Sequence, residues 1–258
     1  MSDIQLKVLG CNGGFGKNHE TTALLLNENI LIDCGTGVGN MEINDLKKID
    51  HVFITHCHLD HIVSLPFLLD LVGVKRANPI QVYASHVTIK AIREHIMNDL
   101  IWPDFTQIPS QIAPSVIFND LSQQAAWNIQ GVKITPIPVP HVVDACAYVI
   151  ESSSGALAFS GDTGFSENLI HSLNEFNKLK HLIIETSFPD EEQYLAELSQ
   201  HLCPQLLTKM LAKLKGRPAI HISHLKPGSN RKILEQIENQ TRRSVKLLKN
   251  NQNIILIL

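Results

Sequence analysis

The sequence has no features of a membrane protein, a secreted protein or a disulfide-rich protein. No apolar run among its 258 residues approaches the length needed to cross a bilayer, and the opening MSDIQLKVLG has no signal-peptide pattern. Its five cysteines are odd in number and show no paired spacing, which indicates free thiols in a reducing compartment. These absences predict a cytoplasmic protein that does not contact a membrane.

A positive net charge is also missing. The formal net charge is -3 at pH 7, so the molecule as a whole does not attract polyanions, and nucleic acid is not the expected partner. No repeat or Gly/Pro/Ser-rich linker divides the chain. We therefore expect one domain over residues 1–258, with a helical insertion at about residues 86–114. The sequence leaves a homodimer open.

The expected elements form two halves of different character. Strands are expected at residues 4–8, 21–26, 29–33, 51–54, 80–84, 116–118, 126–129, 132–139, 145–150, 156–160, 181–185, 219–222 and 254–258. Helices are expected at residues 62–71, 87–100, 167–177, 204–214 and 231–239. Strand-rich halves with intervening helices predict an α/β (α+β) protein in which two sheets pack face to face with helices outside.

Histidine is in excess, with 13 residues, and its densest cluster is His56, His58 and His61 with Asp60. Three imidazoles and a carboxylate cannot all pack in a core without partners. Zinc and similar metals bind histidine nitrogen and carboxylate oxygen. His56 and His58 can point at one ion, whereas Asp60 and His61 can begin a helical turn and reach a second. The cluster therefore predicts a two-metal site, and a solvated histidine-rich loop is the alternative.

Four further motifs lie at the ends of expected strands, and each is weak alone. They are found at residues 32–37 around Asp33, 139–141 ending in His141, 159–164 around Asp162, and 221–224 with His221 and His224. Glycines on both sides of Asp162 let the backbone turn tightly around that carboxylate. Together, these motifs make the solvated-loop alternative unfavourable.

In order and spacing, the five motifs resemble those of the metallo-β-lactamase superfamily, and the resemblance runs from about residue 4 to 228. It implies an αββα sandwich of two mixed sheets with helices on the outer faces and the site on one edge. It also implies two divalent transition-metal ions, with zinc expected and manganese or iron as alternatives. We prefer His224 to His221 as a ligand because His224 lies past the strand end and precedes Leu225-Lys226-Pro227, as in this superfamily.

The resemblance assigns a role to each site residue. His56, His58 and His141 would hold one metal, Asp60, His61 and His224 the other, and Asp162 would bridge them. Asp33, counted with Asp60 among the catalytic residues, would accept a hydrogen bond from a ligand and orient it. Cys34 and Cys57 lie beside these motifs, and we expect them to be small packing residues rather than thiolate ligands.

Several segments narrow the resemblance to class II 3′,5′-cyclic-nucleotide phosphodiesterases. They are residues 58–62, 95–105, 185–188 with 201–207, and 223–227. This resemblance implies hydrolysis of cAMP or cGMP, a small-molecule phosphodiester, to the 5′-monophosphate. Pro66, Cys203 and the absence of longer insertions depart from that family's pattern and bear on nucleotide selectivity.

A mechanism follows from the metal pair. Two divalent ions lower the pKa of a bridging water and so provide hydroxide near neutral pH. The leaving ribose oxygen needs a proton, for which His201 is the candidate donor and Glu185 the group that tunes it. His201 is equally well explained as a residue that precedes a helix beginning at Pro204. Trp102 and Phe105 could stack on the base, or could form an apolar plug under the insertion.

Three other functions remain as alternatives. A tRNA 3′-processing RNA phosphodiesterase would use the same metals and a similar Glu…His pair, but the chain lacks a basic Gly/Pro-rich arm and has a negative net charge. A lactone or thioester hydrolase would not explain the Trp-Pro and His-Leu-Cys-Pro segments. A non-catalytic binding module would not explain a complete set of metal ligands.

Overall fold

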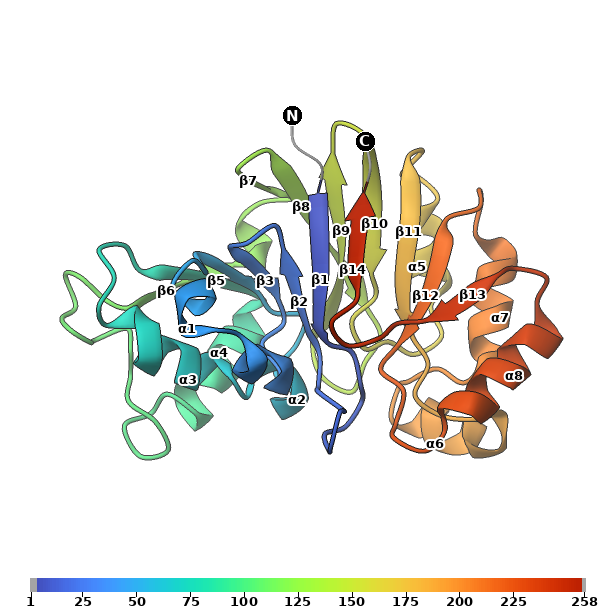
Figure 1. The fold of residues 1–258 in the computed structure, drawn as a ribbon, viewed down its shortest axis with the longest axis horizontal. Helices are drawn as coiled ribbons and strands as arrows, with labels where there is room; N and C mark the ends of the chain where they lie inside the picture. Colours follow the sequence, from blue (N-terminus) through green and yellow to red (C-terminus); the bar gives the residue numbers. More distant parts are fainter. Residues whose placement is uncertain (1–3, 257–258) are drawn as a thin grey trace.

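Within residues 4–256, which the structure describes, the protein forms two seven-stranded mixed sheets that pack face to face (Figure 1). The structure is a computed structural model. The first sheet has the order β14-β1-β2-β3-β4-β5-β6 and the second the order β13-β12-β11-β10-β9-β8-β7. This architecture confirms the predicted sandwich.

The strand bounds follow the expected pattern closely. The first sheet contains β1 (Ile4–Gly10), β2 (Ala23–Leu26), β3 (Ile30–Ile32), β4 (His51–Phe53), β5 (Ile80–Ala84), β6 (Val116–Asp120) and β14 (Asn253–Leu256). The second contains β7 (Trp127–Ile129), β8 (Val132–Val139), β9 (Ala145–Ser152), β10 (Gly155–Phe159), β11 (Leu179–Glu185), β12 (Ala219–Ser223) and β13 (Val245–Leu247). Strands β3 to β6 run parallel to one another, as do β10 to β13, and the other pairings are antiparallel.

Helices cover the outer face of each sheet. They are α1 (Ile43–Leu46), α2 (Leu59–Ile62), α3 (Leu65–Leu68), α4 (His86–His95), α5 (Glu167–Leu173), α6 (Gln193–Leu198), α7 (Pro204–Lys213) and α8 (Asn230–Gln240). Figure 1 shows α3 and α4 on the side of the first sheet and α7 and α8 on the side of the second. None of the helices among residues 4–256 is long and apolar enough to span a membrane.

The hydrophobic core lies in three layers, and the layer between the sheets supports the site. On β1, Ile4, Leu6 and Val8 are buried there, because alternate residues of a strand face the same side. Tyr148 belongs to this layer, and its hydroxyl donates a 2.7 Å hydrogen bond to the carbonyl oxygen of Ile54. That bond anchors the backbone immediately before the histidine-rich loop.

The helix expected at residues 62–71 is divided into α2, α3 and a π-helical turn at Leu69–Gly73. The break falls at Ser64, whose backbone N–H donates to the carbonyl oxygen of Cys34 at 2.9 Å instead of continuing the helix. Pro66 then occupies the first turn of α3, the one part of a helix where its missing N–H has no consequence. A contact with a remote segment has therefore overridden the local periodicity.

The expected helical insertion contains one helix. α4 ends at His95 instead of continuing to residue 100, because the Asn98 side chain accepts hydrogen bonds from the backbone N–H groups of Leu100 and Ile101 and forms a turn. Residues 96–115 contain turns and bends without another helix or strand. The short elements α1, α6 and β13 were not expected from the sequence. The last expected strand is present as β14, although residues 257 and 258 lie outside the described range.

Candidate metal centre

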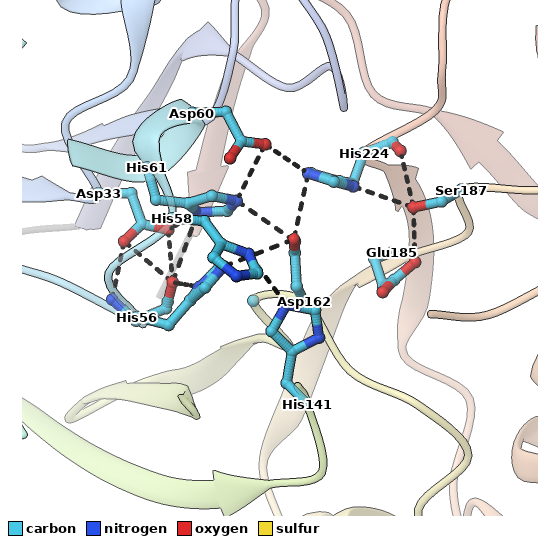
Figure 2. A network of polar contacts seen from close by, with 12 residues as sticks. Asp33, His56, His58, Asp60, His61, His141, Asp162, Glu185, Ser187 and His224 are labelled. Atoms are coloured by element: carbon cyan, nitrogen blue, oxygen red, sulfur yellow. Dashed lines mark hydrogen bonds and ion pairs between the residues drawn. The ribbon is translucent and has the colours of Figure 1, made fainter. Parts of the chain in front are cut away.

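Loops that follow four strands meet at one edge of the sandwich, near α2 at the bottom of Figure 1. The loop after β4 carries His56 and His58, and α2, which follows it, carries Asp60 and His61. The loops after β8, β10 and β12 carry His141, Asp162 and His224, respectively. Their potential ligand atoms form two groups, each with all atoms within 4.8 Å of one another: His56, His58, His141 and Asp162, and Asp60, His61, Asp162 and His224. The structure thus brings together all seven predicted ligands, and Asp162 belongs to both groups (Figure 2).

The potential ligand atoms of the first group lie close together. His58 Nδ1 lies 3.2 Å from His141 Nε2, and His56 Nε2 lies 3.7 Å from Asp162 Oδ2. His141 Nδ1 lies 3.0 Å from the carbonyl oxygen of Gln200, so the Nδ1–H donates there and Nε2 keeps its lone pair for the group. His56 Nε2 is buried and has no hydrogen-bond partner within residues 4–256.

The second group likewise has closely spaced ligand atoms, some of them buried without a partner among the residues that the structure describes. His224 Nε2 lies 3.2 Å from Asp60 Oδ2 and 3.3 Å from Asp162 Oδ2, and His61 Nε2 lies 3.4 Å from Asp162 Oδ1. His61 Nε2 and Asp162 Oδ1 are buried and form no hydrogen bond with any residue in the described part of the chain. A buried polar atom without a partner costs about 1–3 kcal/mol. Such atoms aimed at a common point from histidine and aspartate side chains fit divalent metal ions.

Burial prepares the histidines of the first group for metal binding. It lowers the pKa of His56 well below its ordinary value, and the neighbouring imidazole of His61 adds to this effect. Burial likewise lowers the pKa of His58 and His141. A metal binds the neutral form of histidine, so these shifts remove the competition from protons near neutral pH.

Carboxylates dominate the electrostatics of the second group. Burial would raise the pKa of Asp162, but His224 and His61 hold it well below the ordinary value. Burial likewise opposes ionisation of Asp60, but the adjacent His224 imidazole lowers its pKa. Both carboxylates are therefore ionised over the neutral range and attract cations.

Asp33 contacts His61 of the second group and is shielded from solvent. This fully buried carboxylate accepts hydrogen bonds from His61 Nδ1 at 2.7 Å and from the Thr55 backbone N–H and hydroxyl at 2.8 and 2.9 Å. Burial raises the pKa of Asp33, whereas the donors from His61 and Thr55 oppose that change. The bond to Nδ1 leaves His61 Nε2 directed at Asp162, which is the arrangement expected of a carboxylate that orients a ligand.

A second polar cluster adjoins the two groups. Glu185, fully buried at the end of β11, accepts hydrogen bonds from His201 Nδ1 at 2.6 Å and from the backbone N–H of Thr163 at 3.0 Å. Its other oxygen accepts from the Ser187 hydroxyl at 3.0 Å and from the Leu202 N–H at 3.3 Å. Four donors therefore hold this carboxylate in place and offset the cost of burying it.

His201 lies beside the proposed ligands. Its ring centroid is 5.1 Å from that of His141 and 5.4 Å from that of His224, to which it is nearly parallel. Burial would lower the pKa of His201, but the Glu185 carboxylate raises it above the ordinary value. The structure thus brings the predicted pair of His201 and Glu185 together next to the metal centre.

Two residues of this site were not expected from the sequence. Ser187 connects Glu185 to His224, since its hydroxyl lies 2.9 Å from His224 Nδ1. Thr55 connects Asp33 to His56, with its hydroxyl 3.0 Å from His56 Nδ1. Ser187 lies inside the segment 185–188 noted in the sequence and Thr55 directly precedes His56, but the serine and threonine residue types alone indicate no role.

Other residues singled out in the sequence lie outside the site. Phe105 is 1% exposed in the core beneath the first sheet's helices, so no face of its ring is free to stack on a base; the packing interpretation corrects the stacking one. Trp102 is partly buried, packs against the same core and meets Phe67 edge-on at 5.0 Å. His221 pairs with His181 at 3.1 Å rather than with the ligands, and neither Cys34 nor Cys57 belongs to a ligand group.

Comparisons with known proteins agree with this geometry. A family model described as "Beta-lactamase superfamily domain" matches residues 28–245. The chain is 28% identical over 206 residues to a Yersinia pestis protein named "Probable 3′,5′-cyclic-nucleotide phosphodiesterase", covering 70% of this chain and 58% of that protein. It is 42% identical over 87 residues to "Ribonuclease Z" of Clostridium beijerinckii, covering 31% of this chain and 28% of that protein. The chain thus spans less than two thirds of the length of these curated relatives.

A solved structure matches over the full length. The fold superimposes on unliganded yeast PDE1 with a TM-score of 0.81 at 18% identity, covering 100% of both chains. At that identity, the likeness concerns the fold.

Proposed function

The chain belongs to the β-lactamase superfamily, and from this premise we propose that it is a two-metal phosphodiesterase that hydrolyses 3′,5′-cyclic nucleotides to 5′-monophosphates. One observation carries the proposal: two groups of ligand atoms share Asp162 and adjoin the buried Glu185–His201 pair. The similarity to the Yersinia protein supports a cyclic nucleotide as the substrate. With five free cysteines, we propose a cytoplasmic location.

Each proposed ligand faces a position that suits one ion. His56, His58 and His141 would hold the first ion, Asp60, His61 and His224 the second, and Asp162 both. Histidine nitrogen and carboxylate oxygen suit zinc, which is our proposal, and manganese or iron accept the same donors. When bound, two such ions neutralise phosphate oxygens and lower the pKa of water.

His201 would supply the proton that the leaving group needs. Its Nδ1–H donates to Glu185, so the second proton of the imidazolium is on Nε2. As water adds to phosphorus and releases one proton to solvent, the bond from phosphorus to the 3′ ribose oxygen breaks, and that oxygen takes the Nε2 proton. His201 then recovers a proton from solvent. Glu185 keeps its negative charge through the step because four donors hold it, and it stabilises the imidazolium before the transfer.

Metal analysis combined with a substrate panel tests this proposal. After gentle purification, the protein should contain about two equivalents of zinc, manganese or iron per chain. It should hydrolyse cAMP or cGMP with the 5′-monophosphate as the product. Full metal loading without turnover of either cyclic nucleotide would contradict the substrate assignment, and a metal content near zero would contradict the site itself.

An RNA phosphodiesterase is the second candidate function. The similarity to Ribonuclease Z favours it, although the aligned part covers only 31% of this chain. A precursor tRNA with a 3′ trailer belongs in the same substrate panel. Faster cleavage of that RNA than of either cyclic nucleotide would make this the better proposal.

A further inference from the structure

A basic cavity lies at the end of β12 remote from the metal centre. Its volume is about 620 Å³, and its polar lining comes from Arg217, Arg242, Arg243, Lys246, Thr241 and Ser244. The cavity adjoins Ala219, the first residue of β12, whereas His224 follows the last. At about 3.3 Å per residue, the strand separates the two by roughly 13 Å or more. We propose that this cavity binds an oligophosphate group, either free or carried by a nucleotide.

The positive charge of the cavity is not neutralised by the protein. No ion pair among residues 4–256 involves Arg217, Arg242 or Lys246, and none of the residues that line the cavity is acidic. Cations on the neighbouring helices behave differently, since Lys213 pairs with Glu167 and Lys232 with Glu191. In a chain of net charge -3, three unpaired cations around one hollow make a local site for anions.

Two segments far from the metal centre build the cavity and hold it open. The guanidinium of Arg243 donates to the carbonyl oxygens of Leu214 and, at 3.0 Å, Gly216. These bonds tie the segment before β13 to the loop that carries Arg217. Arg243 is therefore a structural tether, and Arg217, Arg242 and Lys246 remain available to a ligand.

Protection of an exposed strand explains these charges only in part. β13 is the edge strand of its sheet, and charged side chains on edge strands discourage pairing with other chains. Lys246 alone among the four cations lies on β13, whereas Arg217, Arg242 and Arg243 lie outside it. Their convergence on one cavity needs another explanation, and ligand binding supplies one.

The lining chemistry selects phosphate. Guanidinium groups bind phosphate oxygens through paired hydrogen bonds, and Arg217 and Arg242 are both free to do so. The Thr241 hydroxyl accepts a hydrogen bond from the Arg243 backbone N–H, which leaves its own hydrogen to donate. Several cations suit a ligand with several negative charges. The volume falls within the roughly 300–1,000 Å³ of small-ligand sites, which favours an oligophosphate over a long nucleic acid.

Direct binding to the full chain tests the proposal without reference to turnover. The probe is ATP that carries an anthraniloyl fluorophore on its ribose, followed by anisotropy at low salt. The wild type is compared with Arg217→Gln/Arg242→Gln, and with the control Lys75→Gln/Arg93→Gln, which removes the same charge from exposed positions elsewhere. We expect at least about tenfold weaker binding for the cavity variant and unchanged binding for the control. Because the metal ligands are intact in all three proteins, the difference reports on the cavity alone.

Competition then identifies the ligand. Displacement of the probe by tripolyphosphate as well as by ATP would show that a free oligophosphate suffices, whereas displacement by ATP alone would show that the nucleoside contributes. Adenosine should not compete. Equal affinity of the cavity and control variants would overturn the proposal. Displacement by a short RNA at much lower concentration than by ATP would overturn it in favour of a nucleic-acid surface.

Discussion

The Ser187 hydroxyl oxygen lies 2.9 Å from Nδ1 of His224 and connects that proposed ligand to the buried carboxylate of Glu185. The hydroxyl donates its single hydrogen to Glu185 and accepts the Nδ1–H of His224. This fixes the His224 tautomer in which Nε2 carries the lone pair, and Nε2 is the atom that faces Asp60 and Asp162. One serine therefore joins the proposed metal ligands to the proposed proton donor.

Ser187→Ala should weaken metal binding because His224 loses the partner that selects its tautomer. The affinity should fall by about 10–100-fold, as is typical for partners of metal ligands. Competition with a chromogenic chelator measures this change. Ser199→Ala is a matched control, since the Ser199 hydroxyl donates to the Leu195 carbonyl oxygen at 2.6 Å, away from the proposed ligands. An unchanged affinity for Ser187→Ala would show that the contact has no orienting role.

Asp162→Ala should reduce metal binding much more than Asp33→Ala. Asp162 belongs to both ligand groups, so its loss should remove most of both metals and the activity with them. Asp33 belongs to neither group and acts through His61 and, by way of Thr55, through His56, so its loss should cost about 10–100-fold in metal affinity. Elemental analysis after gel filtration separates the two results. Equal loss of metal from the two variants would contradict these roles.

His201→Ala should retain both metals and the fold but lose about 10²–10⁴-fold in turnover of cAMP, the usual contribution of a positioned acid. Bis(p-nitrophenyl) phosphate expels a stable phenolate that needs no proton, so its hydrolysis should change little. Gln205→Ala, exposed at the start of α7, controls for disturbance of that helix. Equal losses on both substrates would make His201 a structural residue.

The pH dependence of turnover should follow the raised pKa of His201. An acid must be protonated to act, and the Glu185 carboxylate keeps His201 protonated to higher pH than an ordinary histidine. Turnover of cAMP should therefore persist above pH 6.5 and fall as the pH rises through the raised pKa. Turnover of bis(p-nitrophenyl) phosphate should not show this decrease at alkaline pH. The same decrease in turnover at alkaline pH on both substrates would assign the titration to a group other than His201.

Phe105→Ala should act on stability rather than on substrate binding. Because Phe105 is 1% exposed in the core, its truncation should cost about 3–5 kcal/mol in the free energy of unfolding. Urea denaturation measures the loss, and KM for cAMP should stay near the wild-type value. A large rise in KM with unchanged stability would restore the base-stacking role.

The sequence alone determined most of the strands and the histidine-rich part of the site. Alternation of buried residues along β1 and the bounds of β8 follow from period-two patterns, which depend only on neighbouring residues. His56, His58, Asp60 and His61 could be grouped because they lie within six residues of one another. Because so few residues separate them, these four side chains must lie close together in any fold.

Only the tertiary structure decided how distant segments meet. Asp162 reaches His56, and His224 rather than His221 reaches Asp60, because parallel strands deliver their following loops to the same edge of the sandwich. The carbonyl oxygen of Cys34 breaks a helix that local periodicity favours, by accepting the Ser64 N–H. Hydrogen bonds and packing between segments far apart in the chain leave no periodic trace in the sequence, so they decided the helix breaks, the place of Phe105 and the Ser187 bridge.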